Sequence, residues 1–274
     1  MFTLVFGILT RIVSNSYLNV CQKILTNKGE FPSVINFYTY LGLTLIAFLL
    51  CPNPLFSTEI LFNFFVMGFL GAIGNYFIIK ALSCGELSSL APINSYKPIV
   101  ALILGYFVLN EIPQIIAVLG IILIILGTII LSKTSLIFCK ATFYRILALV
   151  FSGSEAIFIK RIILLSDVSS SFFYWALASL MFTLIFVFTS RHSIKINKTN
   201  IKYQLYLIIM VALMQYSTNF VFAKMNVAYA LALFQLSTIL SVFLGVNIFK
   251  EKDMLRKICA SIIMLVGAVV IILG

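Results

Sequence analysis

Ten long apolar runs, separated by short polar breaks, occupy almost the whole of this 274-residue sequence. A helix of about 20 apolar residues spans the hydrocarbon core of a bilayer, whereas the strands of a membrane barrel alternate polar and apolar residues. Soluble domains carry about a quarter charged residues, but here 10% of the residues are charged and 62% are hydrophobic. We therefore predict an all-α polytopic membrane protein with ten transmembrane helices, at residues 2–25, 33–50, 60–82, 89–109, 114–132, 142–164, 169–190, 203–224, 228–249 and 254–273.

The basic residues gather on one set of helix connections. The formal net charge of +11 would favour a nucleic-acid partner in a soluble protein, but Lys and Arg in short loops instead orient a membrane protein towards the cytoplasm. We therefore expect a lipid bilayer and no nucleic acid as partner, with both termini outside the cytoplasm. The side assigned to the cytoplasm carries Lys23, Lys28, Lys80, Lys133, Lys140, Arg145, Arg191, Lys195, Lys198, Lys202, Lys250, Lys252, Arg256 and Lys257, against Lys160, Arg161 and Lys224 on the other side.

Motifs of catalytic and metal sites are missing from the sequence. The five cysteines are scattered without a CxxC pair and His192 is the single histidine, which argues against a disulfide framework and a metal site. The sequence has no GxSxG motif and no nucleotide-binding loop, so we expect no enzyme, no catalytic residue, no cofactor and no ATP-driven pump. The run MFTLVFGILTRIVSN lacks a basic leader, and we interpret it as the first span.

The two halves of the sequence resemble each other. Aligning GYFVLNE (105–111) with GVNIFKE (245–251) pairs Glu111 with Glu251 and, further on, Gly127 with Gly267. We therefore divide the chain into a first five-helix repeat, 1–134, and a second, 135–274. Because five is odd, the second copy enters the membrane from the opposite side, which gives an inverted repeat. Substrate sites of such proteins form near the midplane between the repeats, and one chain is sufficient to function as a monomer.

A dispersed pattern of small residues and prolines runs through residues 68–127. It consists of Ala-Leu, Ala-Pro, a second proline, a glycine, Leu-x-Glu and two spaced glycines: Ala81, Leu82, Ala91, Pro92, Pro98, Gly105, Leu109, Glu111, Gly120 and Gly127. This pattern resembles the EamA-type domain of the drug/metabolite transporter superfamily. The resemblance implies secondary transport of a small metabolite by alternating access, and we expect the inner (plasma) membrane of a bacterium as its location.

The sequence departs from that family in three respects. The first span carries Arg11 instead of the Trp-Gly pair often found there, and Thr238 stands in the second copy where the first has Pro98. Many relatives are thought to keep both termini in the cytoplasm, whereas the loop charges of this chain favour the reverse orientation.

Three ionisable residues lie inside predicted spans: Arg11, Lys97 and Glu155. Each costs about 2.5–3.5 kcal/mol at a helix centre, so such residues usually face a bundle interior or an aqueous cavity. A scaffold residue should recur in both repeats, but these three align with Ala148, Ser237 and Leu18, respectively. Because a substrate is asymmetric, we predict that the three charges bind it.

Polar and aromatic side chains extend the predicted site. Asn15 and Asn19 share a helix face with Arg11, Asn94 precedes Lys97 by three residues, and polar residues recur in the eighth and ninth spans. An aromatic residue near the centre could stack on a substrate or hold a quaternary ammonium group. The additional substrate-binding residues that we predict are Asn15, Asn19, Asn94, Gln215, Asn219, Gln235, Trp175 and Tyr38.

Each of these features also has a structural interpretation. Arg11 and Glu155 could form an internal ion pair that only fixes packing, and Lys97 could extend to the cytoplasmic end of its helix. The Asn and Gln residues could be interhelical hydrogen-bonding groups.

Two cations and one carboxylate at membrane depth favour an anionic or zwitterionic solute, with an amino acid-like metabolite as the first choice. A nucleotide-sugar or phosphorylated-metabolite exchanger would use the same cations. The alternative is an exporter of organic cations, drugs or choline-like compounds in which Glu155 exchanges a coupled proton for the cargo.

Overall fold

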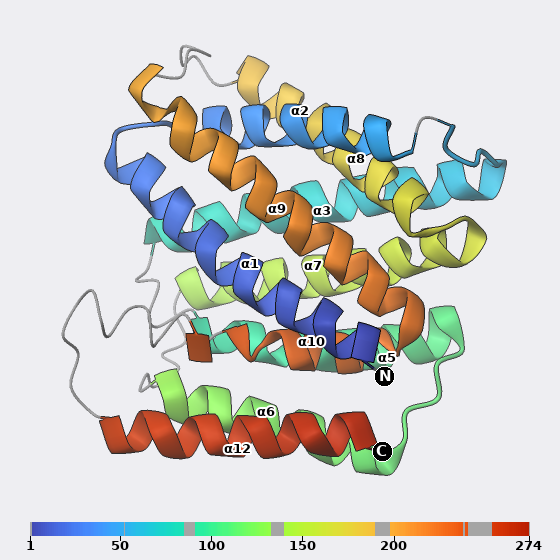
Figure 1. Ribbon diagram of the computed structural model, residues 1–274, viewed down its shortest axis with the longest axis vertical. Coiled ribbons are helices and arrows are strands. Elements are labelled where there is room, and N and C mark those ends of the chain that lie inside the picture. The colour runs from blue at the N-terminus through green and yellow to red at the C-terminus, as the bar shows by residue number, and fades with distance from the viewer. Residues whose placement is uncertain are drawn as a thin grey trace. The chain divides into compact units, whose positions relative to one another are not determined.

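The computed structural model describes residues 2–51, 53–84, 91–132, 140–189, 198–237, 239–240 and 254–273, and these residues form helices without a strand (Figure 1). The helices are α1 (Phe2–Asn27), α2 (Pro32–Leu50), α3 (Thr58–Cys84), η1 (Ala91–Tyr96), α5 (Lys97–Leu109), α6 (Ile115–Ser132), α7 (Lys140–Leu165), α8 (Val168–Thr189), η2 (Lys198–Asn200), α9 (Ile201–Lys224), α10 (Val227–Phe234) and α12 (Met254–Leu273). The predicted all-α polytopic fold is confirmed.

Several helices begin at residues whose chemistry favours a helix N-terminus. Ser57 accepts a hydrogen bond from the Ile60 N–H at 3.1 Å before α3, and Asn226 accepts one from the Ala228 N–H at 2.9 Å before α10. Asp167 accepts bonds from the Ser169 and Ser170 N–H groups, at 2.7 and 2.9 Å, at the start of α8. Such caps satisfy backbone donors that have no acceptor within the helix, so the polar breaks of the sequence set the helix boundaries.

The outward-facing positions of these helices are apolar. Phe62, Phe107, Ile115 and Leu265 are among many large hydrophobic side chains that remain exposed, a surface that suits lipid rather than water. Five described helices contain segments long and apolar enough to cross a membrane: Phe2–Gln22, Ser33–Leu50, Thr58–Ile78, Val168–Ile185 and Ile201–Lys224. Shorter apolar helical segments are Ile93–Leu109, Ile115–Ile130 and Ile258–Leu273.

The chain forms two compact units, and each combines helices from both halves of the sequence. Unit 1 contains residues 1–72 and 158–224, and unit 2 contains residues 73–157 and 225–274. In unit 1, α1 lies along α9, and α2 lies against α8 and α9 (Figure 1). The Gln204 amide of α9 donates to the Ile35 carbonyl and the Thr39 hydroxyl of α2, at 3.1 and 2.8 Å, so polar contacts also join these helices.

In unit 2, α6 and α12 lie side by side over their length (Figure 1). Gly120 and Gly267 face each other so closely that a Cβ on either would stand 2.7 Å from the other's carbonyl oxygen. The second helix pair of this unit is α5 with α10. There the Glu111 carboxylate accepts from the Val227 N–H at 3.2 Å, so the Leu-x-Glu motif caps the N-terminus of α10.

The fourth predicted span, 89–109, is not one continuous α-helix. A 3-10 turn, η1, ends at Tyr96, and α5 begins at Lys97 with Pro98 in its first turn. Proline has no N–H to donate, so it is favoured where a helix starts and disfavoured within one. The span therefore restarts at the lysine. The ninth predicted span, 228–249, begins with α10, and its residues from 241 onwards lie outside the described residues, as do residues 250–253.

Candidate substrate-binding site

Lys97 occupies the first position of α5, at the junction with η1. Its aliphatic chain passes α7 at Gly153, where a Cβ would stand 3.7 Å from the Lys97 Cγ and 3.1 Å from the Val100 Cβ. The absent side chain of Gly153 therefore leaves room for Val100, whereas the base of Lys97 lies at ordinary contact distance from this point of α7. Glu155 is half-buried two residues further along α7. Because residues two apart on a helix point to different sides, this places Glu155 on the helix that Lys97 contacts but not on the same face as Gly153.

Arg11 lies in unit 1, where α1 and α9 are in contact. Its Nε donates a hydrogen bond of 2.8 Å to the Thr218 hydroxyl, and that hydroxyl donates to the Met214 carbonyl at 2.7 Å. Thr218 thus fixes the guanidinium against α9. Sequence reasoning missed Thr218, although it lies between Gln215 and Asn219, two residues that we predicted to bind substrate.

The other predicted polar residues of α1 and α9 differ in their burial and in their side-chain contacts. Asn15 is half-buried one turn after Arg11, and the side chain of Asn19 lies outside the described part. Gln215 and Asn219 are buried in unit 1. Their side-chain amides lie 2.9 Å apart on consecutive turns, and the Asn219 amide also lies 3.2 Å from the Phe172 N–H of α8. This pair therefore has packing contacts in addition to any role in binding.

The two predicted aromatic residues, Trp175 and Tyr38, contact different rings in the structure. Trp175 is buried and meets Tyr40 edge to face, with ring centroids 5.5 Å apart, whereas Tyr38 meets its neighbour Phe37 at 5.3 Å. Tyr40, two residues after Tyr38, is the aromatic partner that sequence reasoning missed. Trp175 meets Tyr40 because α8 packs against α2. The alignment of the two halves of the sequence does not show which helices pack together.

Asn94 and Gln235, the remaining predicted residues, belong to unit 2. Asn94 is half-buried in η1, close in sequence to Lys97. Gln235 directly follows α10, and its amide donates to the Leu231 carbonyl at 3.4 Å. Asn94 thus precedes α5, the helix that begins with Lys97, and Gln235 follows α10, the helix that packs against α5.

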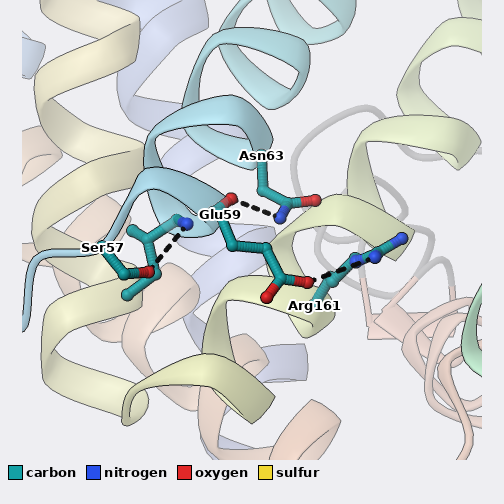
Figure 2. A network of polar contacts seen from close by, with 5 residues as sticks. Ser57, Glu59, Asn63 and Arg161 are labelled. Carbon is teal, nitrogen blue, oxygen red and sulfur yellow. Dashed lines mark hydrogen bonds and ion pairs between the residues drawn. The ribbon is translucent and has the colours of Figure 1, made fainter.

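An ion pair on α3 and α7 lies apart from the predicted residues. The Arg161 guanidinium lies 3.4 Å from the Glu59 carboxylate, and Asn63 donates to the Glu59 backbone carbonyl at 2.7 Å (Figure 2). The two charged side chains are 39% and 55% exposed. A pair this exposed contributes about 0–1 kcal/mol, so we assign it to the helix ends of unit 1 and not to the site.

Taken together, apolar helices with charged residues retained on several of them define an all-α polytopic membrane protein. The model of the EamA-like transporter family matches residues 2–133 and again residues 140–273. The chain therefore belongs to the EamA-like transporter family, whose members are transporters and not enzymes, and it is a transporter of the drug/metabolite transporter superfamily.

Comparison with solved structures supports the fold. One, whose title reads "Crystal structure of protein", matches 100% of this chain and 97% of its own chain, with a TM-score of 0.79 and 15% sequence identity. At that identity the likeness shows the fold alone. No curated protein matches the sequence.

Proposed function

We propose that this transporter carries a small anionic or zwitterionic metabolite, with amino acid-like solutes as the first choice. The observation that supports this most is the position of Lys97 at the start of α5, with the base of its side chain close to Gly153 of α7, the helix that also carries Glu155. Lysine provides a compact cation, arginine a bidentate fork, and both bind carboxylate or phosphate groups.

Within this proposal the three charges have separate roles. We assign Lys97 and Arg11 to anion binding, and Glu155 to binding of an ammonium group or a coupled proton. The hydrogen bond from Arg11 to Thr218 supports the assignment, because a neutral hydroxyl orients the guanidinium without neutralising its charge. Transport then proceeds by alternating access across an inner (plasma) membrane.

A charge-selective transport assay tests the proposal. Wild-type protein and three variants, Lys97→Ala, Arg11→Ala and Glu155→Gln, are reconstituted in liposomes and challenged with anionic, zwitterionic and cationic solutes. We expect the two cation variants to lose uptake of carboxylates, by roughly tenfold or more, as follows from the loss of a charge-assisted hydrogen bond. If Glu155→Gln alone abolishes transport while both cation variants stay active, the cargo is an organic cation and the proposal fails.

We also propose that both termini lie outside the cytoplasm, because of the loop charges described above. Reporter fusions at each terminus measure this orientation directly. A cytoplasmic C-terminus would contradict the proposed orientation and would leave the proposal about the transported solute unchanged.

A further inference from the structure

Arg145 is a buried arginine that the proposed site does not use. It belongs to α7, its side chain is 6% exposed, and its Nε has no hydrogen-bond partner among the described residues. The sequence groups Arg145 with the cytoplasmic loop cations, which we expected to be solvated, whereas the structure buries it. A buried N–H of a guanidinium without an acceptor is costly, and an anion that is bound during function would satisfy it.

The face of α7 that carries Arg145 points into unit 2. Phe143, Ile146 and Val150 are exposed and form the outer face of the helix. Ala141, Arg145 and Leu149 follow one another at intervals of four residues and are buried. The guanidinium is therefore on the side away from lipid.

A hydrophobic cluster shows what this face contacts. Ala141 and Leu149 pack with Ala81 and Ile93, and Tyr96, Val100 and Tyr144 pack around them. Arg145 lies between Ala141 and Leu149 on α7, and Lys97 directly follows Tyr96. Both cations thus border the same cluster.

The spacing along α7 separates the two cations. The Lys97 chain lies against Gly153, which is eight residues after Arg145, or about 12 Å along a helix axis. The two cations therefore meet α7 at backbone positions about two turns apart.

A third cation adds to the positive potential here. Lys80, which precedes Ala81 of the cluster, holds its Nζ 4.9 Å from the centroid of the Tyr144 ring and 3.2 Å from the Tyr76 hydroxyl. Helices α3, α5 and α7 thereby bring three cationic side chains to one cluster of unit 2. Cations of one sign along low-dielectric walls raise the local concentration of anions.

We propose that Arg145 binds the carboxylate or phosphate group of the solute at a second position on α7, about two turns before the position of Lys97. The guanidinium fork suits such a group because it offers parallel N–H donors. The inference deepens the proposed function and rests on it in one respect, that the solute is anionic or zwitterionic.

Binding of inorganic phosphate tests this assignment without a known substrate. The protein is held in phosphatidylcholine nanodiscs, and its thermal unfolding is followed with phosphate or with chloride at equal ionic strength. We expect phosphate to raise the unfolding temperature of the wild type in a saturable way. Arg145→Gln should weaken the apparent phosphate affinity by at least about tenfold, and Arg145→Lys by less, because a lysine restores the charge but not the fork.

Arg161→Gln is the matched control, since it removes an arginine from the same helix at its exposed end. That variant should respond to phosphate as the wild type does. If Arg145→Gln folds poorly, Arg145→Lys still tests the assignment. A reduced phosphate affinity in that variant shows that the parallel N–H donors of the guanidinium are needed in addition to a positive charge.

Two results would overturn the assignment. In the first, Arg145→Gln keeps the wild-type affinity or the wild type shows no response. In the second, phosphatidylglycerol nanodiscs abolish the response, which would make a lipid headgroup the ligand.

The outcome is distinguishable from a failure of the proposed function. That failure would appear as unchanged carboxylate transport in Lys97→Ala and Arg11→Ala, whereas the difference in phosphate affinity between wild type and Arg145→Gln reports the Arg145 position.

Discussion

At the scale of single residues, Asp167 shows how a polar break stabilises an apolar helix. Partial burial raises the pKa of this carboxyl group, but the Ser170 hydroxyl and the N–H groups of Ser170 and Ser169 lower it by more, so the pKa lies below its ordinary value. The depressed pKa means that the ionised form is the one that folding favours. Asp167 therefore stabilises α8 at neutral pH.

Replacing Asp167 tests this cap. We expect Asp167→Ala to lower the free energy of unfolding by about 0.5–2 kcal/mol and Asp167→Asn by less, because asparagine keeps an accepting oxygen. The difference between wild type and Asp167→Ala should be complete above the ordinary carboxyl pKa of 3.8 and should shrink as the pH falls through the lower folded value. Thermal unfolding in detergent between neutral and acidic pH measures both effects; a difference that grows towards acidic pH would contradict the account.

The sequence predicts which residues are candidates for the site more readily than it predicts which residues contact them. Lys97, Arg11 and Glu155 were recognisable because charges inside apolar runs are rare. The contact of Arg11 with Thr218, the pairing of Trp175 with Tyr40 and the burial of Arg145 all depend on which helices meet. Helix contacts between distant parts of the chain have no periodic signal in one sequence, so these features required the structure.

At the scale of elements, hydropathy located the helices closely. The first three predicted spans, 2–25, 33–50 and 60–82, correspond to α1, α2 and α3, each within two residues at either end. The fourth differs because hydropathy does not register a change from 3-10 to α geometry. Pro98 carried that information, since proline in the first turn is a start signal.

The contact between α6 and α12 leads to an element-scale prediction. A Cβ at Gly267 would stand 2.7 Å from the Gly120 carbonyl oxygen and 3.0 Å from two side chains of α6. Because backbone cannot move aside as a flexible side chain can, we expect Gly267→Ala to destabilise the protein by about 1–3 kcal/mol. Thermal unfolding of the purified protein measures the loss.

Gly74→Ala is the control for that prediction. A Cβ at Gly74 would meet its neighbours at 3.4–3.6 Å, which is ordinary contact, and alanine is the better helix former. Gly74→Ala should therefore be neutral or slightly stabilising. Equal losses at Gly74 and Gly267 would show that close packing is not the cause.

At the scale of the whole molecule, sequence repeats and compact units are different divisions of the chain. The family model matches the two halves separately, but each compact unit takes helices from both halves. Two of the three unit boundaries fall within α3 and α7, and the third lies between α9 and α10. Internal similarity predicted the repeat. It could not predict the units, because packing between α1 and α9 or between α6 and α12 joins segments far apart in the chain.

For the whole transporter, our central proposal is that Lys97 selects an anionic or zwitterionic solute. The most direct measurement is counterflow in proteoliposomes, in which a labelled carboxylate or amino acid outside exchanges with an unlabelled pool inside. The account predicts counterflow for anionic and zwitterionic solutes in the wild type and its loss in Lys97→Ala. Counterflow of organic cations that persists unchanged in Lys97→Ala, without exchange of carboxylates by the wild type, would contradict it.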